Sequence, residues 1–410
     1  MKCRLCCAPA DDVFLDLGAA PLSNAYLSAA QCQRAEPYWP LRLHACPQCR
    51  LVQLQAFERA DSVFSPDYAY FSSYSRSWLE HARSFVDRAV DQLALGPHSR
   101  VVEVASNDGY LLQYVRQHGI ACAGIEPTAS TAAAAREKGI ETHEFFLGRQ
   151  TAREFVARHG HADLVVANNV LAHVPDLRDF VDGLAALLAR EGTLTIEFPH
   201  LLELVGGNQF DTVYHEHYSY FSLHAARRAL DGAGLRVRAV ESLPTHGGSL
   251  RLWVGHHDAA MGAADDPDSV VAHVAREQAA GIDTDAFYRG FQLRADSVKN
   301  AFLEFLLQQK RHHRRVGAYG AAAKGNTLLN YAGVKPDLLG WVVDASPHKR
   351  GLFLPGSRIP IVDESRIRQE QPDFIVILPW NLRDEIEAQL AYARAWGARF
   401  VVAVPQLEIW

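Results

Sequence analysis

Five titratable side chains follow one another between Tyr214 and Tyr218 of this 410-residue sequence. On a helical turn, Tyr214 and His217 would share one face, which places a phenol beside an imidazole. Such a pair can remove a proton and return it. A solvated turn rarely combines so many aromatic side chains with histidines, so we interpret the stretch as a reaction site. His173 follows a predicted strand; a single histidine on such a loop is more often structural, but this one lies at the same predicted sheet edge.

Six of the seven cysteines lie in the first 49 residues, four of them in the pairs Cys3-x-x-Cys6 and Cys46-x-x-Cys49. Four thiolates at tetrahedral spacing satisfy Zn²⁺ completely and form a closed, structural site. A thioredoxin-type redox motif, the alternative, needs one pair and leaves the second unexplained. His44 could replace one thiolate, but we predict a structural zinc on the four cysteines.

Residues 100–254 alternate short β-branched runs with helical stretches, which is typical of a doubly wound sheet. A short turn joins the last two predicted strands, 236–242 and 249–255, into a hairpin that a purely parallel nucleotide-binding sheet lacks. The five strands before the hairpin are expected at Val101–Ala105, Ala121–Glu126, Glu141–Phe145, Leu164–Ala167 and Gly192–Glu197.

A polar loop, Glu103–Leu111, ends the first of these strands and contains Gly109, which permits a tight turn where the backbone approaches a ligand. Glu126 follows about 20 residues later at the tip of the second strand, where a carboxylate can accept both hydroxyls of an adenosine ribose. An Asn-Asp-Gly sequence is also an ordinary turn, so the loop is informative only together with the terminal hairpin.

That combination resembles the class I S-adenosylmethionine-dependent methyltransferases, with their seven-stranded sheet. The resemblance implies that the methionine part of the cofactor lies near the first strand, the ribose on Glu126 and the sulfonium beside Asn168. Phe145 and Phe146 could enclose adenine, although Phe145 is as readily a core residue. The cofactor residues implied in this region are Glu103, Ser106, Asn107, Gly109, Glu126, Phe146 and Asn168.

Between the cysteines and the sheet lies a hydroxyl-rich segment, Tyr68–Ser75. It is either a polar linker or a cover over the amino acid end of the cofactor. We favour the cover, formed by Tyr70, Ser73 and Tyr74.

The chain is similar to the sugar C-methyltransferases over essentially its whole length. Four motifs carry this resemblance: the paired cysteines, the Ser-Asn-Asp-Gly loop, Tyr214–His217 and His246–Arg251. That family acts on nucleotide-linked 4-keto-6-deoxysugars at the carbon next to the ketone, with C-3 as the expected position. The resemblance implies His217 as the base, with Tyr214, Glu216 and His173 as supporting residues and His246, Ser249 and Arg251 near the substrate.

Those roles agree with enolate chemistry. A carbon next to a ketone becomes nucleophilic only after its proton is removed, and the enolate then needs stabilisation. His217 can take the proton, Tyr214 can donate a hydrogen bond to the enolate oxygen, and Glu216 can orient an imidazole. The sequence leaves open whether His217 or His173 is the base.

The C-terminal third is expected to form a second, Rossmann-like α/β unit. A connector at 263–268 and a long helix from Asp285 to His313 precede a strand, a Gly-rich turn and a helix at Val316–Thr327. Such a turn can hold a phosphate, and Lys324 adds a cation beside it. We expect Gly320, Lys324 and Asn326 to dock the nucleotide diphosphate. The predicted domains are a zinc-binding segment at 1–70, a methyltransferase core at 71–285 and the C-terminal unit at 286–410.

Composition limits the other possibilities. The chain has 41 basic and 47 acidic residues and a net charge of −6, which gives no general attraction for nucleic acid or anionic lipid. No apolar run approaches the roughly 18 residues of a membrane span, and the first residues lack the apolar core of a signal peptide. We expect a cytoplasmic monomer without nucleic acid or membrane partners.

Three alternatives remain from the sequence. A metal-dependent hydrolase would use His173, His215 and His217 as ligands, and a nicotinamide oxidoreductase would use the loop Gly317–Gly320. A zinc-bearing scaffold without activity would leave the Tyr214–Tyr218 cluster unexplained.

Overall fold

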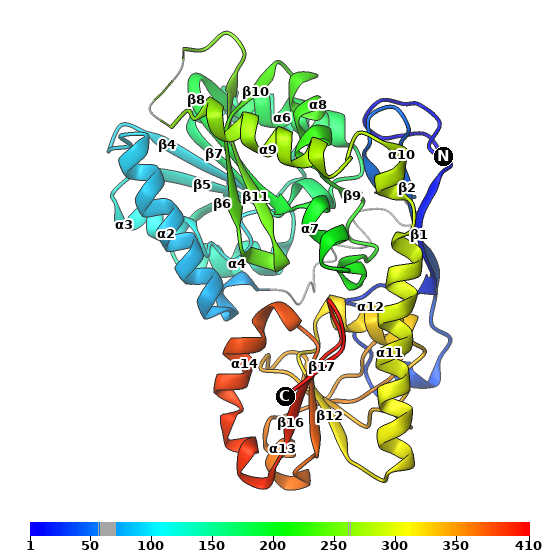
Figure 1. Cartoon of the computed structure of the whole chain (residues 1–410). Helices are drawn as coiled ribbons and strands as arrows, with labels where there is room; N and C mark the ends of the chain where they lie inside the picture. Colours follow the sequence, from blue (N-terminus) through cyan, green and yellow to red (C-terminus); the bar gives the residue numbers. More distant parts are fainter. Residues whose placement is uncertain (56, 58–70, 261, 263) are drawn as a thin grey trace.

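The computed structural model describes residues 1–55, 57, 71–260, 262 and 264–410, and the strands among them form three sheets. Figure 1 shows the seven-stranded sheet above the six-stranded one, with β1 (Val13–Ala20) and β2 (Trp39–Ala45) beside the long helix α11 (Phe291–Arg311). No helix in these described ranges is long and apolar enough to cross a membrane. Tyr70, predicted to bind the cofactor, lies outside the described residues.

The N-terminal sheet contains β1, β2, β3 (Val52–Leu54) and β9 (Ser219–Tyr220), in that order. The strand β9 comes from the middle of the chain and pairs with β3, Val52 opposite Tyr220. Phe14 of β1 stacks on Phe291 of α11 with ring centroids 5.1 Å apart. The N-terminal sheet therefore joins the predicted reaction segment to the C-terminal third.

The seven-stranded sheet has the order β10-β11-β8-β7-β4-β5-β6. Its first five strands in the chain are parallel, and β11 runs antiparallel to both neighbours, as the predicted hairpin requires. Val101 and Val102 are fully buried because helices cover both faces of such a sheet. The strands are β4 (Arg100–Val104), β5 (Ala121–Ile125), β6 (Glu141–His143), β7 (Ala162–Asn168), β8 (Leu188–Pro199), β10 (Leu235–Leu243) and β11 (Ser249–His256).

The helices of this part alternate with its strands. Figure 1 shows α2 along one side of the sheet and α9 across it. They are α2 (Arg76–Gln92), α3 (Leu112–Gln117), α4 (Ala129–Glu137), α5 (Arg149–His159), α6 (Leu177–Leu187), α7 (Leu201–Gly206), α8 (Leu223–Asp231) and α9 (Pro267–Ala279).

The C-terminal sheet has the order β14-β13-β12-β15-β16-β17, parallel except for the last strand. This arrangement confirms the predicted Rossmann-like unit. Its strands are β12 (Val316–Tyr319), β13 (Val342–Val343), β14 (Ile361–Val362), β15 (Phe374–Ile377), β16 (Arg399–Val402) and β17 (Glu408–Ile409); with α11 its helices are α12 (Ala323–Tyr331), α13 (Ser365–Glu370) and α14 (Arg383–Gln389).

The structure corrects two expectations about the link between the sheets. Residues 264–266 of the predicted connector are non-helical, but the connector ends at α9, whose first turn is capped by the Asp266 side chain accepting from the Ser269 N–H at 3.1 Å. The predicted long helix is broken, because Gly290 with φ of 82° separates the short α10 (Asp285–Tyr288) from α11.

Candidate active site

The predicted reaction residues lie on two loops at the carboxyl-end edge of the seven-stranded sheet. Tyr214 to His217 is a single β-turn rather than a helical turn, with the His217 N–H donating to the Tyr214 carbonyl at 3.0 Å. The turn still brings the two rings together, centroids 4.1 Å apart. His173, from the turn after β7, lies 4.6 Å from His217 by the same measure. We call Tyr214, His217 and His173 the reaction cluster.

Two hydrogen bonds fix the loops to each other. The Tyr218 N–H donates to the Ala172 carbonyl at 2.7 Å, and His173 Nδ1 lies 2.9 Å from the Glu216 carbonyl. A carbonyl oxygen can only accept, so Nδ1 carries the hydrogen and Nε2 is the His173 nitrogen that can take up a proton.

Burial sets the protonation of both imidazoles. It lowers the pKa of His173 to about 4. Burial, together with the nearby His173, His246 and Lys324, holds the pKa of His217 well below its usual range. Both rings are therefore neutral at pH 7 and able to accept a proton. A negative charge on a bound substrate would raise both pKa values toward neutrality.

The Glu216 carboxyl group does not touch an imidazole in the described structure. It is buried, and its Oε1 accepts a hydrogen bond from Asn24 Nδ2 at 3.1 Å. Burial raises its pKa. Glu216 thus contacts His173 through its main-chain carbonyl, while its side chain connects the turn to the N-terminal segment.

The C-terminal sheet adds a cation beside the reaction cluster. Lys324 Nζ donates to Asn381 Oδ1 at 2.6 Å and lies 4.6 Å from the centre of the Trp380 ring. The Trp380 Nε1–H donates to Asp211 Oδ2 at 2.8 Å. Burial lowers the pKa of Lys324 to about 8, although Asp211 opposes this effect. Burial raises the pKa of Asp211 to about 6, although the charge of Lys324 acts to lower it.

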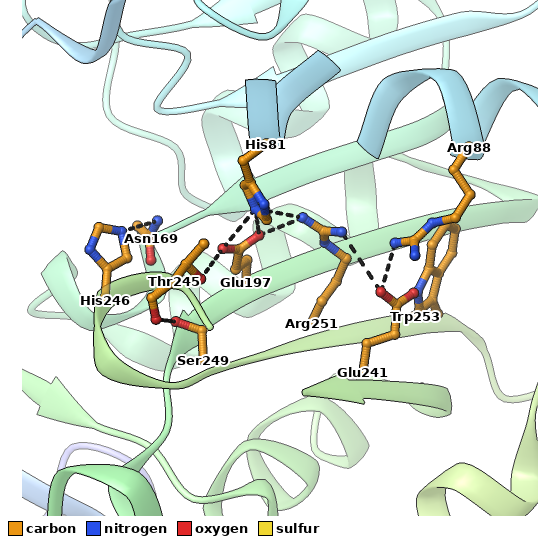
Figure 2. A network of polar contacts seen from close by, with 10 residues as sticks. All are labelled: His81, Arg88, Asn169, Glu197, Glu241, Thr245, His246, Ser249, Arg251 and Trp253. Atoms are coloured by element: carbon orange, nitrogen blue, oxygen red, sulfur yellow. Dashed lines mark hydrogen bonds and ion pairs between the residues drawn. The ribbon is translucent and has the colours of Figure 1, made fainter. Parts of the chain in front are cut away.

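His246, predicted near the substrate, also lies on this side of the molecule. Its Nε2 is 3.3 Å from Asn169 Nδ2 (Figure 2). Its ring centroid is 5.3 Å from that of Trp78. Burial, followed by the charge of Lys324, lowers the pKa of His246 to about 4. The charge of His173 also lowers the pKa of His246, and the charge of His246 lowers that of His217, so His246 lies near the reaction cluster.

A buried ion network holds the loop that carries His246 (Figure 2). Its centre is Glu197 at the end of β8, whose oxygens contact His81 Nε2 at 2.9 and 3.1 Å. Arg251 Nη2 donates to Glu197 Oε2 at 2.6 Å, and the Thr245 hydroxyl donates to Glu197 Oε1 at 2.9 Å. Burial alone would raise the pKa of Glu197, but the His81 hydrogen bond and the Arg251 charge bring it down to about 2.

Ser249 and Arg251, both predicted to bind substrate, lie inside this network. Each is 1% exposed, and the Ser249 hydroxyl donates to the Thr245 carbonyl at 2.9 Å. Their contact with substrate stays a prediction, whereas the contacts observed hold the Thr245–Gly247 turn in place.

Glu126 lies just beyond the carboxyl end of β5, where each of its oxygens accepts one main-chain hydrogen bond. The Asn107 N–H donates to Oε2 and the Thr128 N–H to Oε1, both at 2.9 Å. Burial raises the pKa of Glu126. Each carboxylate oxygen has a second lone pair, so ribose hydroxyls can still be accepted.

Buried polar atoms without a partner gather at the ends of β4 and β7. Within the described residues, the Ser106 hydroxyl and the side-chain oxygens of Asn168 and Asn169 make no hydrogen bond. The carboxyl oxygens of Glu103 also make no hydrogen bond of normal geometry with the described residues. Burial holds the pKa of Glu103 well above its usual range. Buried polar groups require partners. The ammonium and carboxylate of an amino acid supply them, so this set fits the methionine end of S-adenosylmethionine.

Ser72 and Ser73 of the hydroxyl-rich segment contact the Glu103–Leu111 loop through their backbone amides, and the Ser73 N–H donates to Asp108 Oδ2 at 3.3 Å. The Ser72 N–H donates to Asn107 Oδ1 at 2.9 Å, and the Ser73 hydroxyl accepts from Lys138 Nζ at 2.7 Å. Tyr74 is 59% exposed and contacts His348 of the C-terminal unit at 3.1 Å. Its cofactor contact, like that of Ser73, stays a prediction.

Two other predicted cofactor residues differ in their surroundings. Gly109 has φ of 74°, and a Cβ there would lie 2.3 Å from Ile140 Cδ1, so glycine is needed for the turn and its packing. Phe146 is 47% exposed, whereas Phe145 packs on the core.

The Gly-rich loop after β12 uses its own amides to hold its shape. The N–H groups of Gly320 and Ala321 donate to the Val343 carbonyl at 2.7 Å and to Asp344 Oδ2 at 2.8 Å. The side-chain oxygen of Asn326 is buried and has no partner in the described part of the chain. The predicted phosphate contacts therefore depend on Lys324 and Asn326 more than on the loop.

The four predicted zinc ligands come together, with their sulfur atoms all within 4.8 Å of one another. Cys3 and Cys49 lie 3.4 Å apart and Cys6 and Cys46 3.5 Å apart, sulfur to sulfur. A hydrogen bond from Cys49 lowers the pKa of Cys3 to about 4. Four cysteine sulfurs at this spacing fit a closed zinc site.

Among the described residues, His173, His215 and His217 do not form a set with metal-binding spacing. His215 Nε2 instead lies 3.3 Å from the Trp39 carbonyl. The metal ligands that a hydrolase of this kind needs are therefore not assembled.

Sequence reasoning missed several residues that surround the reaction cluster. Trp380 and Asn381 follow the β-branched strand β15, so their position at its carboxyl end was a usable signal. Asn24 carried no such signal, because only the folded chain brings it to Glu216.

The strand order, the antiparallel β11 and the buried polar side chains at the ends of β4 and β7, which lack partners in the described structure, define a class I methyltransferase. The chain belongs to the C-methyltransferase family: it is 34% identical over 413 residues to the C-methyltransferase NovU of Streptomyces niveus, covering 100% of this chain and 96% of that protein. Three family models also match, described as "Putative zinc binding domain" (residues 3–64), "Methyltransferase domain" (78–240) and "C-methyltransferase C-terminal domain" (244–405). The protein is thus an S-adenosylmethionine-dependent C-methyltransferase with a zinc-binding segment.

Two solved structures that this chain resembles cover half of it or less. Magnesium protoporphyrin IX methyltransferase of Synechocystis PCC 6803 is 17% identical, with 43% of this chain and 82% of that one covered and a TM-score of 0.34. A methyltransferase of Anabaena variabilis is 13% identical, with coverage of 50% and 100% and a TM-score of 0.38. Scores this low add nothing to the assignment.

Proposed function

We propose that the protein methylates C-3, next to the ketone, of a nucleotide-linked 4-keto-6-deoxysugar through an enolate, in the formation of a branched deoxysugar. The reaction cluster carries this proposal. Methyl transfer to carbon requires a carbon nucleophile, and a ketone makes the neighbouring C–H acidic enough for a histidine to remove its proton. His217 and His173 are neutral by virtue of burial, as that step requires.

His217 removes the proton and Tyr214, whose ring lies 4.1 Å away by centroid, donates a hydrogen bond to the enolate oxygen. His173 is the alternative base, held in one tautomer by the Glu216 carbonyl. S-adenosylmethionine, when bound, supplies the electrophilic methyl group. Glu103, Ser106, Asn107, Glu126 and Asn168 hold its amino acid and ribose ends, and the closed surroundings of the cluster exclude water.

The nucleotide diphosphate would bind on the C-terminal side. Lys324 is positively charged at pH 7, since its pKa is lowered only to about 8, and its charge is felt at His217. Asn326 lies in the same helix as Lys324, α12, and its buried side-chain oxygen has no hydrogen-bond partner among the described residues. The charges of Lys324 and His173 also act on His246. A cation among neutral imidazoles favours a diphosphate as the group bound there.

We further propose a cytoplasmic monomer that divides into residues 1–70, 71–285 and 286–410. Shared packing between β1 and α11 supports a fixed arrangement of the first and third units.

The proposal is tested by incubating the protein with S-adenosylmethionine and a panel of nucleotide 4-ketosugars, then locating the new methyl group by mass spectrometry and NMR. We expect a methyl on the carbon next to the ketone. The matched nucleotide sugar with a 4-hydroxyl should not react, because its C–H is not acidified. A methyl on oxygen or nitrogen, or equal reaction of the 4-hydroxyl sugar, would contradict the enolate route.

A further inference from the structure

A second group of metal-binding side chains lies on the edge strand of the seven-stranded sheet. Glu141 and His143 are two residues apart in β6 and share a face, and His159 is the last residue of α5. Their ligand atoms all lie within 4.8 Å of one another. Apart from the four cysteines, no other set in the described ranges has this spacing.

The distances suit a small ion. His143 Nε2 lies 2.9 Å and His159 Nδ1 3.7 Å from Glu141 Oε1. In a tetrahedral site with bonds of about 2.0–2.2 Å, neighbouring ligand atoms are about 3.4 Å apart. The two observed distances lie on either side of that value, and the third pair of ligand atoms, on His143 and His159, also lies within 4.8 Å, so side-chain adjustment without any change of fold would admit the ion.

A buried aromatic ring holds both imidazoles in place. Phe155 is 2% exposed, and His159 stacks on it with centroids 4.6 Å apart. His143 meets the same ring edge-on at 5.2 Å. Within the described residues, the ionic partners of Glu141 are these two imidazoles, so no lysine or arginine competes for the carboxylate.

We propose that Glu141, His143 and His159 form a second metal site, which binds Zn²⁺ or a similar transition-metal ion with water completing the coordination. Two imidazoles and one carboxylate favour such ions over Mg²⁺ and Ca²⁺, which prefer oxygen ligands. The three side chains are 58%, 27% and 29% exposed. This ion therefore exchanges with solvent, unlike an ion enclosed by the four cysteines.

The test uses untagged full-length protein that retains its tightly held zinc. Calorimetric titration with Zn²⁺ should show one further ion per chain, and titration with Mg²⁺ should show none. The affinity for the added Zn²⁺ should fall by at least about tenfold in each of three variants, His143→Gln, His159→Gln and Glu141→Gln. The matched control is His161→Gln, because His161 is exposed, lies two residues from His159 and is outside the set. Its Zn²⁺ affinity should equal that of the unchanged protein.

A measurement on the unchanged protein guards against misfolded variants. Diethylpyrocarbonate labelling, mapped by mass spectrometry, should modify His143 and His159 less when Zn²⁺ is added and His161 equally with and without it. No further Zn²⁺ per chain, equal binding of Mg²⁺, unchanged affinity in the three variants, or unprotected His143 and His159 would each overturn the second site.

Discussion

Burial of His217 and His173 gives each ring a pKa below its usual range and so keeps both ready to accept a proton. The same burial leaves Lys324 charged at pH 7 but only just so. At the scale of single residues, the site therefore combines neutral bases with one cation. The Glu126 carboxylate contributes differently, since it holds the Asn107 amide and, in the function we propose, accepts the ribose hydroxyls through its remaining lone pairs.

Glu126→Ala should weaken S-adenosylmethionine binding. It removes hydrogen bonds to a charged group, each worth roughly 1.5–3 kcal/mol, and also releases the Asn107 and Thr128 amides. Glu126→Gln, which keeps the size and one acceptor oxygen, should lose less. Calorimetry measures both; an unchanged affinity in Glu126→Ala would refute the ribose assignment.

Affinity for the nucleotide sugar should fall as the pH rises above about 8. Below the Lys324 pKa of about 8 the ammonium is charged, and above it the charge is lost. The dissociation constant should therefore rise by up to about tenfold per pH unit above that pKa. Lys324→Gln should bind more weakly and show no bend near pH 8. A wild-type profile without that bend would contradict a role for Lys324 in diphosphate binding.

At the scale of elements, Glu197 connects three segments that are distant in sequence: α2 through His81, β11 through Arg251 and the Thr245–Gly247 turn through Thr245 (Figure 2). That connection positions His246.

The parallel strands and the terminal hairpin could be predicted because each depends on a local sequence pattern, namely β-branched runs and turn residues. The network could not, because its partners are separated by up to 170 residues and no local pattern pairs them.

The break at Gly290 and the capped start of α9 show a second limit of local patterns. A polar stretch with Pro267 looks like a connector, yet proline is favoured in the first turn of a helix. Among site residues, the cysteine pairs and Tyr214–His217 were predictable from spacing. The contact between Trp380 and Asp211 could not be predicted, because 169 residues separate the two in the chain.

His81→Ala should destabilise the protein by about 1–3 kcal/mol, because it leaves part of the buried Glu197 carboxylate unsatisfied. His118→Ala serves as the control, since His118 pairs with Asp87 in an exposed position and such pairs contribute about 0–1 kcal/mol. Urea unfolding measures both variants. An equal decrease in the free energy of unfolding in the two variants would show that the Glu197 network does not stabilise the fold.

At the scale of the whole molecule, the reaction cluster is assembled from parts that the chain order separates. The strand β9, directly after the Tyr214–His217 turn, completes the N-terminal sheet, and Asn24 of that segment reaches Glu216. The C-terminal unit supplies Lys324 from the first turn of α12. Loss of the N-terminal structure should therefore disturb the active site even though the cysteines take no part in the chemistry.

Removing the zinc tests this dependence. Protein dialysed briefly against a chelator should retain about one zinc per chain, because four thiolates close the site. Cys46→Ser should lower that content, destabilise the fold and reduce activity, whereas the exposed Cys7→Ser should change none of these. Full zinc content in Cys46→Ser would refute the four-cysteine site.

Removal of a proton from the substrate carbon by His217 is the central claim, and solvent exchange measures it directly. Nucleotide 4-ketosugar is incubated in deuterated water with the protein and a cofactor analogue that lacks the methyl group, and deuterium at the carbon next to the ketone is followed by NMR. Unchanged protein should exchange that position, and His217→Asn should bind both ligands but lose exchange by about 10²–10⁴-fold. Normal exchange in His217→Asn with loss in His173→Asn would make His173 the base. Normal exchange in both variants would contradict enolate chemistry at this cluster.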